Sequence, residues 1–297
     1  MPGGISRKTE NSVKFLLMAV DIVKASGLPQ KFDMRKLADS LMRSGAPEEV
    51  ALDIARKVEK KIPQEASTKA VFRMAKRLLR RYNRVSGMRY SLKNALYALG
   101  PAGYRFEKYM ARILRAHGYS TEVDQIMDGY CVKHEVDVLA IRKGEHFVIE
   151  CKYHSDGGTA TDVKTALYVH SRFVDIRKAC DLKPGHPAGV HYGMLVTNTR
   201  CTTDAIKYAE CVGLRVMSWK YPEKESLERI IEGRRLYPAT ILHSARKRTL
   251  EALFSHDIIL AQDVAGMDER VLARRSGLDH ETARVLKREA EELCPCE

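Results

Sequence analysis

Two apolar segments that carry charged residues in their interior constrain this chain more than any other feature. Residues 134–141 read HEVDVLAI and residues 147–152 read FVIECK. Both segments are rich in β-branched residues, and residues 143–145 between them have the composition of a tight turn, so we predict a β-hairpin. Because side chains two positions apart on a strand share a face, Glu150 and Lys152 are expected to point the same way.

Charged side chains inside strands this apolar are costly unless they are paired or bind a ligand. A structural ion pair between Glu150 and Lys152 at a sheet edge is one explanation. The other brings in Asp137 from the first strand of the hairpin. Two carboxylates at the same end of a hairpin form a hard oxygen site suited to Mg²⁺ or Mn²⁺. A lysine beside them can position water and offset charge on a phosphate.

A predicted helix that begins near Gly103 adds a further acid to this set. Together with the hairpin, the sequence GYRFE at 103–107 resembles the PD-(D/E)xK nuclease superfamily, and within it the Mrr-like restriction endonuclease branch. The resemblance implies a metal-dependent nuclease domain over residues 100–222. The implied roles are metal ligation by Asp137, Glu150 and the backbone carbonyl of Cys151, catalysis by Lys152, and an accessory acid near the metal at Glu107.

Strand and helix signals alternate after the hairpin, which predicts an α/β layer with a mixed sheet. Asp162 is expected to begin an amphipathic helix, residues 191–196 a strand, and Thr202 another helix. Two residues here are candidate DNA contacts: Lys164, which can equally lie on a solvated face, and His134, which can equally be a structural histidine.

The formal net charge is +13, which makes a polyanion the first partner to consider, with nucleic acid ahead of an anionic membrane. Nearly all of the excess lies in residues 56–93, which hold 13 basic and 2 acidic side chains. Such runs usually form a solvated helix face, but unpaired like charges repel within a helix. Arg77, Arg80 and Arg81 are therefore candidate DNA contacts, and docking on the nuclease domain is the other role considered.

Residues 18–99 are predicted to form a short hairpin followed by three or four helices, one of them beginning at Asp33 and another at Ser67. This region resembles the ATP-cone, a small regulatory module that binds ATP or dATP. The residues that carry the resemblance are Val23-Lys24, Gly27, Phe32-Asp33, Lys36-Leu37 and Ser44-Gly45-Ala46. The resemblance implies that Lys24 and Lys36 contact phosphates and that Gly27 belongs to the binding turn. The family's usual Lys-Arg-Asp-Gly turn is Lys-Ala-Ser-Gly here. A plain helical bundle that contacts DNA is the alternative.

The C-terminal region, residues 223–297, shows helical patterns and no strand signal. Ser276-Gly277-Leu278-Asp279 resembles a helix-hairpin-helix turn, whose backbone amides can hold a DNA phosphate, so Gly277 is a candidate DNA contact. Simple packing or dimerisation is the alternative. Residues 1–17 are expected to be an accessory extension.

The longest apolar run near the N-terminus, residues 15–20, is far shorter than the roughly 20 residues of a membrane span. Seven scattered cysteines favour a reducing compartment, so we expect a cytoplasmic protein that does not associate with membranes. The predicted fold class is α/β multidomain.

The predicted function is a metal-dependent DNA endonuclease regulated by ATP or dATP. The rival is a nucleotide-responsive DNA-binding regulator that does not cleave, and a further alternative is a junction-resolving nuclease. Cutting both strands would favour a homodimer, because one metal site cuts one strand at a time.

Overall fold

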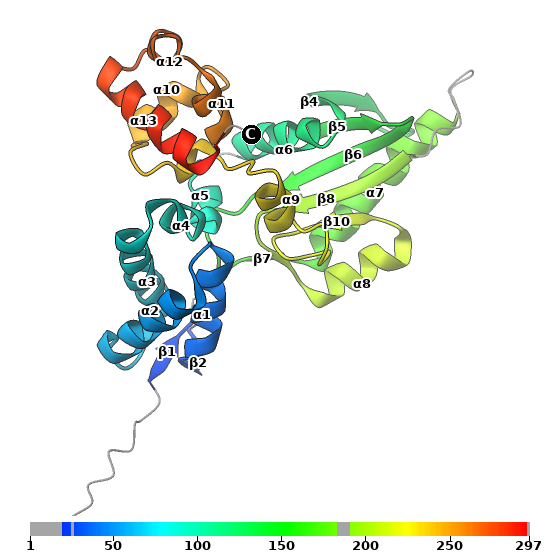
Figure 1. Cartoon of the computed structure of the whole chain (residues 1–297). Helices are drawn as coiled ribbons and strands as arrows, with labels where there is room; N and C mark the ends of the chain where they lie inside the picture. The colour runs from blue at the N-terminus through cyan, green and yellow to red at the C-terminus, as the bar shows by residue number, and fades with distance from the viewer. Residues whose placement is uncertain (1–19, 25–26, 102, 183–190, 296–297) are drawn as a thin grey trace, which may run out of the picture.

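The structure is a computed structural model that describes residues 20–24, 27–101, 103–182 and 191–295. The predicted extension 1–17, residues 25–26 of the first turn, and Cys296 lie outside these ranges. The described residues form an N-terminal lobe, a central α/β lobe and a C-terminal helical lobe (Figure 1). The predicted α/β class, with a mixed central sheet and helices at the C-terminal end, is confirmed. No helix within the described ranges is long and apolar enough to span a bilayer.

The N-terminal lobe encloses its own hydrophobic core between three helices and a three-stranded sheet. Its elements are β1 (Asp21–Val23), β2 (Pro29–Lys31), α1 (Met34–Arg43), α2 (Glu48–Lys61), β3 (Ala66–Ser67) and α3 (Thr68–Tyr82). β1 pairs antiparallel with β2 and parallel with β3. Asp33 begins α1 by accepting a hydrogen bond from the backbone N–H of Lys36 (2.9 Å), as its position predicts. Ser67 begins α3 in the same way.

The central lobe is built on a five-stranded sheet of order β10-β8-β6-β5-β4. Its helices are α4 (Arg84–Arg89), α5 (Leu92–Tyr97), α6 (Tyr104–Ala116), α7 (Val163–Asp181) and α8 (Thr203–Val212). Its strands are β4 (Ser120–Asp128), β5 (Lys133–Arg142), β6 (Glu145–Lys152), β7 (Ala160–Thr161), β8 (His191–Thr197), β9 (Arg200–Cys201) and β10 (Arg215–Met217). The predicted hairpin is β5–β6. Sequence reasoning missed β4, which pairs antiparallel with β5.

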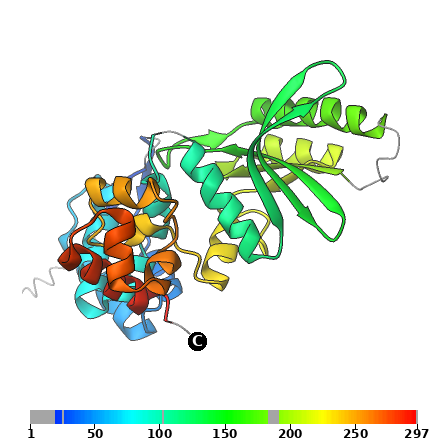
Figure 2. The same cartoon turned by 90° about the horizontal axis from the view of Figure 1, so that it is seen from above.

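The sheet is mixed, because β6, β8 and β10 are parallel whereas β4, β5 and β6 are antiparallel. Helices cover both faces, with α6 on one side and α7 and α8 on the other (Figure 2). Val138 packs in the core that includes α6, but Val136, two residues earlier, packs with Phe173 of α7. Strict alternation would place both valines on one face. The side-chain alternation of β5 therefore changes phase at Asp137.

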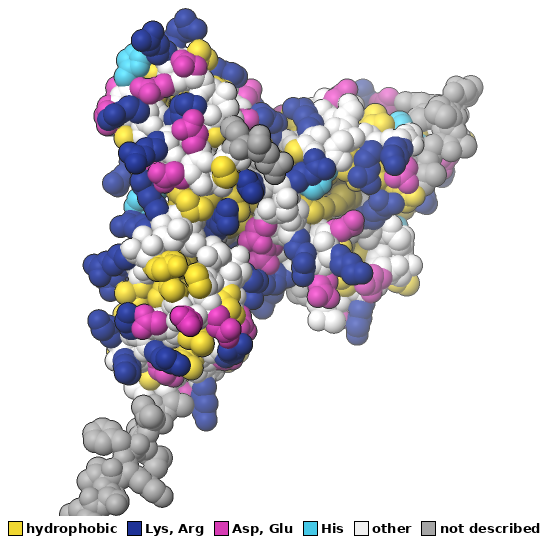
Figure 3. All heavy atoms as spheres, in the orientation of Figure 1, with side chains coloured by type: hydrophobic (Ala, Val, Ile, Leu, Met, Phe, Trp, Pro, Cys, Tyr) yellow, Lys and Arg dark blue, Asp and Glu magenta, His cyan; other side chains and the backbone are white. Residues whose placement is uncertain are grey.

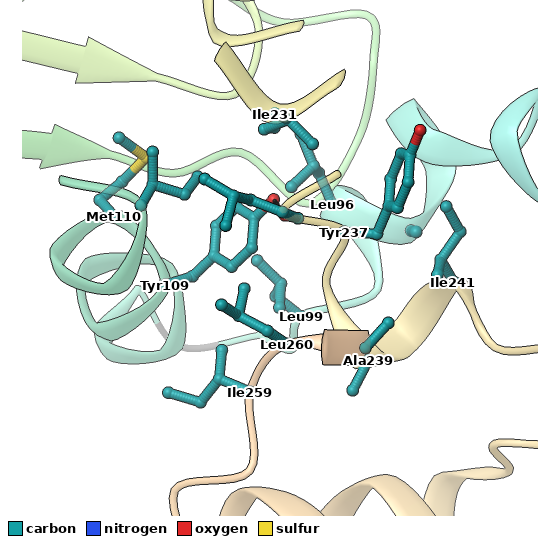
Figure 4. Close-up of a cluster of buried hydrophobic side chains, with 14 of the residues drawn as sticks. Leu96, Leu99, Tyr109, Met110, Ile231, Tyr237, Ala239, Ile241, Ile259 and Leu260 are labelled. Atoms are coloured by element: carbon teal, nitrogen blue, oxygen red, sulfur yellow. Dashed lines mark hydrogen bonds between the residues drawn. The ribbon is translucent and has the colours of Figure 1, made fainter. Parts of the chain in front are cut away.

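The C-terminal lobe packs on the central lobe and shares its core. Its elements are α9 (Leu227–Gly233), the 3₁₀ turn η1 (Ala239–Ile241), α10 (Lys247–Phe254), α11 (Ala261–Gly266), α12 (Glu269–Ser276) and α13 (His280–Leu293). Tyr109 of α6 is fully buried, and its hydroxyl donates to the carbonyl of Leu236 (2.8 Å). Figure 4 shows Tyr109 beside Leu99 and Leu260, in a cluster that also contains Ile231 of α9 and Ala239 of η1.

The hydrophobic cores divide the chain before residue 100, where the nuclease domain was expected to begin. The N-terminal core runs from Ile22 to Leu79, whereas Met88 and Leu99 belong to the central core. The physical reason is that α4 and α5 direct their apolar faces at the central lobe. Residues 88–99 therefore connect the two lobes: most of their buried side chains pack in the central core, whereas Tyr90 packs against the N-terminal one.

Candidate active site

The candidate site lies where strands β5 and β6 stop pairing. Their last paired residues at this end are Val138 and Ile149, and the same register places Asp137 opposite Glu150. Beyond this point β6 continues beside β8, up to Lys152 opposite Thr197. The backbone N–H of Cys151 donates instead to the carboxylate of Asp137 (2.6 Å). This hydrogen bond fixes the orientation of the Asp137 side chain at the point where the strands diverge.

A further carboxylate, which sequence reasoning missed, comes from β4. The β4–β5 register continues across Val123–Val138 and Gln125–Val136, which places Asp124 opposite Asp137. Asp124 has a left-handed backbone (φ 54°), a conformation that aspartate tolerates better than most residues. Only the pairing of β4 with β5 identifies Asp124 as a member of the site, because nothing in the sequence of residues 120–128 distinguishes this acid from its neighbours.

Glu107 completes the group from the first turn of α6. The helix N-terminus favours its ionised form. Burial opposes this and is the largest cause that raises the pKa of Glu107 to about 7, followed by the negative charges of Asp137, Asp124 and Glu150. The structure therefore brings together the acids that the sequence predicted, Glu107, Asp137 and Glu150, and adds Asp124.

Burial also raises the pKa values of the two predicted metal ligands. For Asp137 the hydrogen bond from Cys151 and the charge of Arg172 oppose the effect of burial. For Glu150 the negative charge of Asp137 adds to burial, and Arg172 and Lys152 oppose both. Crowded, half-buried carboxylates with raised pKa values are typical of functional sites, because a cation or a proton must compensate their repulsion.

Arg172 of α7 is the second functional candidate that sequence reasoning missed. One guanidinium nitrogen lies 2.5 Å from the carboxylate Oε2 of Glu150, and another donates to the backbone carbonyl of Glu135. The Arg172 and Glu150 side chains are only 16% and 22% exposed, so water screens this ion pair weakly. A structural ion pair between Glu150 and Lys152 was the alternative explanation for these charges, but Glu150 pairs with Arg172 instead.

Lys152 is exposed at the end of β6, on the same side of the strand as Glu150. Burial and then the positive charge of Lys152 lower the pKa of His154, and the same charge partly offsets the rise in the pKa of Glu150. The neighbouring Tyr153 hydroxyl donates to the carbonyl of Tyr97 (2.7 Å) and so ties this strand end to the N-terminal side of the lobe. Lys152 is therefore available to an incoming substrate beside the carboxylates.

The donors at this site are of the kind that Mg²⁺ or Mn²⁺ prefers, but they are not preassembled around an ion. Over the described ranges, no group of three or more His, Cys, Asp and Glu side chains is arranged to hold a metal ion. Asp137, Glu150 and the backbone carbonyl of Cys151 nevertheless supply the hard oxygen donors that these ions prefer. The chemistry of the donors fits the ion, and the Glu150–Arg172 pair shows that one ligand would exchange partners on binding.

The two other predicted DNA contacts of this lobe lie apart from the carboxylates. The His134 ring nitrogen Nε2 lies 2.8 Å from Asp175 of α7, and the backbone N–H of Cys131 donates to the same carboxylate. His134 therefore holds the start of β5 against α7, which is the structural role that the sequence left open. Lys164 is exposed in the first turn of α7.

The predicted contacts outside this lobe are dispersed. Arg77 and Arg81 are exposed on α3, whereas the guanidinium of Arg80 contacts His243 of the C-terminal lobe and not the nuclease domain on which docking was considered. Gly277 ends α12 with a left-handed backbone (φ 68°), as a tight helical hairpin requires.

The three residues of the predicted nucleotide site fall on the N-terminal lobe. Lys24 and Gly27 lie in the turn between β1 and β2, where the backbone N–H of Gly27 donates to the carbonyl of Lys24 (2.9 Å). Lys36 lies on α1 and lines a cleft that faces the central lobe. The turn and this cleft are different parts of the lobe.

Comparisons with known proteins agree with the central and C-terminal lobes. Residues 101–220 match the restriction endonuclease family Mrr_cat, and residues 237–294 match the AF1548-like C-terminal family. An uncharacterized protein of Archaeoglobus fulgidus is 38% identical over 184 residues, which is 62% of this chain and 99% of the relative. The crystal structure of the protein of unknown function AF1548 covers 65% of this chain and 98% of its own, with 36% identity and a TM-score of 0.56. The chain therefore belongs to the AF1548-like proteins and contains a restriction-endonuclease-like domain followed by an AF1548-like C-terminal domain.

Proposed function

We propose that this protein is a metal-dependent DNA endonuclease. The observation that carries the proposal is the meeting of Glu107, Asp137 and Glu150 beside Lys152, inside the region that matches the restriction endonuclease family. A bound Mg²⁺ or Mn²⁺ ion would supply Lewis-acid stabilisation of the phosphodiester and lower the pKa of water.

The protein's own residues have separate tasks in this proposal. Asp137 and Glu150, with the Cys151 carbonyl, would hold the cation, and the Cys151 N–H keeps the Asp137 carboxylate oriented. Lys152 places a positive charge where negative charge develops on the phosphate. With a pKa of about 7, Glu107 can accept or release a proton near neutral pH, as an acid–base group must.

The test is cleavage of supercoiled and linear DNA with Mg²⁺ or Mn²⁺. We expect the wild type to cut and Lys152→Ala to lose at least about a hundredfold in rate, the scale of a lost transition-state contact. Lys207→Ala, which removes an exposed lysine from α8, is the matched control. Equally poor cutting by the wild type and Lys152→Ala with either metal would refute the proposal.

A DNA-binding regulator without cleavage is the second candidate, and the Glu150–Arg172 ion pair is the observation that favours it. An arginine that neutralises a metal ligand would suit a site that no longer binds metal. This candidate predicts DNA retention in a mobility-shift assay and no cleavage with any divalent metal. Cleavage that Lys152→Ala abolishes would exclude it.

We further propose that ATP or dATP binds the N-terminal lobe and regulates the nuclease. The support is the resemblance of residues 18–99 to the ATP-cone, with Lys24, Gly27 and Lys36 as the implied contacts. Cleavage rates with and without ATP would measure the regulation, and Lys24→Ala would test the contact.

A further inference from the structure

A cleft between the N-terminal and central lobes has the size and lining of a ligand site. Its volume is about 770 Å³, within the range of roughly 300–1,000 Å³ typical of small-molecule pockets. One wall comes from α1, α3 and the α4–α5 region, and the other from β9, α9 and the segment after β10. Figure 3 shows the hollow between the lower-left lobe and the lobe on the right, with charged side chains beside it.

The cleft is strongly basic, and both lobes contribute to its charge. Two acids, Glu228 and Glu232, line it together with six basic residues, so an excess of four positive charges faces the cleft. Lys220 pairs with Glu228 (3.3 Å), but the other five bases make no ion pair within 4 Å to any residue that the structure describes. The six basic residues are Lys36, Arg43, Arg89, Lys93, Arg200 and Lys220.

Two of these basic side chains, Arg89 and Lys93, lie in unfavourable surroundings in the folded protein. The Nε of Arg89 is buried and has no hydrogen-bond partner among the described residues, so the fold leaves this guanidinium incompletely satisfied. Burial, together with the positive charges of Lys220 and Arg200, lowers the pKa of Lys93, although Glu228 partly offsets this. Self-repulsion of this kind favours a multiply charged anion.

Aromatic rings supply the apolar part of the lining. Phe72 of α3 and Tyr90 stack at a centroid distance of 4.9 Å, with 12° between their planes. Across the cleft lies Trp219, with the Nζ of Lys93 5.6 Å from the centre of its ring. Flat rings next to unpaired cations are the combination that binds a base together with its phosphates.

We propose that this cleft binds a nucleoside phosphate, supplied either as a free nucleotide or as an unpaired nucleotide of a DNA strand. The phosphates lie among Arg43, Arg89, Lys93 and Arg200, and the base packs against the aromatic wall. Because the lining residues of α1 and α3 belong to the N-terminal lobe and most of the others to the central and C-terminal lobes, an occupied cleft holds the N-terminal lobe against the other two.

This inference rests in part on the nucleotide regulation proposed above, because Lys36 belongs to both sites. It differs in placing the ligand in the cleft and not at the Lys24–Gly27 turn. The binding chemistry needs neither metal nor cleavage. It can therefore be measured in EDTA, independently of the nuclease site.

The experiment measures binding by the full chain of two probes, ATP by calorimetry and a fluorescein-labelled oligothymidylate by anisotropy. The test variant Arg43→Gln/Arg200→Gln removes one exposed cation from each wall. The control Arg73→Gln/Lys207→Gln removes the same charge from exposed positions on α3 and α8 outside the lining. Unchanged melting temperatures verify that both variants fold.

We expect the test variant to weaken binding of the true ligand by on the order of tenfold or more, and the control to change it little. Loss confined to ATP identifies a free nucleotide, and loss confined to the oligonucleotide identifies a DNA strand. Equal losses in test and control variants would overturn the inference. ATP binding that Lys24→Ala abolishes and the test variant leaves unchanged refutes the cleft site but upholds nucleotide regulation. No binding of either probe by the wild type refutes both.

Discussion

Replacing Glu107 by glutamine should stabilise the metal-free protein, by an amount that depends on pH. Glutamine keeps the size of the side chain and removes the charge that burial, Asp137, Asp124 and Glu150 all disfavour. The folded-state pKa of Glu107 is raised, so the folded protein holds this proton more tightly than the unfolded chain does. As pH rises from 4.5 to about 7, the unfolded chain ionises first and the wild-type fold loses stability.

The size of this stability difference follows from the shift in the pKa of Glu107. A pKa raised from 4.5 to about 7 corresponds to an upper limit of about 3 kcal/mol at 1.36 kcal/mol per unit. Glu107 is only half-buried, and water screens part of the interaction, so we expect about 2 kcal/mol. The glutamine variant should equal the wild type near pH 4.5 and exceed its stability by this amount at pH 8.

Urea unfolding in EDTA at pH 5, 6, 7 and 8 measures the difference directly, since a single-site change should move the midpoint and leave the slope unchanged. Glu122→Gln, an exposed acid on β4, is the matched control and should change stability little at any pH. A Glu107→Gln variant that is no more stable than the wild type at pH 8, or whose advantage does not grow with pH, would refute the description of the site as crowded carboxylates.

Two further predictions concern the framework of the site. Arg172→Ala should destabilise the metal-free protein by about 2 kcal/mol in urea unfolding, because it leaves the largely buried Glu150 without its partner. Mg²⁺ should recover part of this loss, and a variant as stable as the wild type would contradict the role assigned to the pair. Gly193→Ala should cost about 1–3 kcal/mol, because a Cβ there would lie 2.7 Å from the Phe173 ring in the core between β8 and α7. A change below about 0.5 kcal/mol would show that α7 can move away from the sheet.

Local patterns were enough to predict most of the elements that carry the site. The β5–β6 hairpin follows from strand composition and from Gly144, which tolerates the positive φ that its turn requires. The helix starts at Asp33, Ser67 and Asp162 follow from side chains that accept a backbone hydrogen bond three residues ahead. These features depend on neighbours within a few residues, which is why a single sequence reveals them.

The sequence alone also identified Glu107, Asp137, Glu150 and Lys152 as a chemically coherent set, because their spacing resembles a nuclease motif. It did not reveal Asp124 or Arg172. Asp124 reaches the site only through the pairing of β4 with β5, and Arg172 reaches Glu150 only because α7 packs across the sheet. Contacts of this kind join residues far apart in the chain, and no local periodicity encodes them.

The net charge of the chain shows the same division between local and tertiary information. The sequence located the excess in residues 56–93 and indicated a phosphate-bearing partner. Only the tertiary structure turned Arg89 and Lys93 of that stretch toward Arg200 and Lys220, more than a hundred residues later, and enclosed a cleft between them. Charge is a sum over residues and can be read from composition. The place where charges converge depends on how the lobes pack, because packing alone brings distant residues within reach of one ligand.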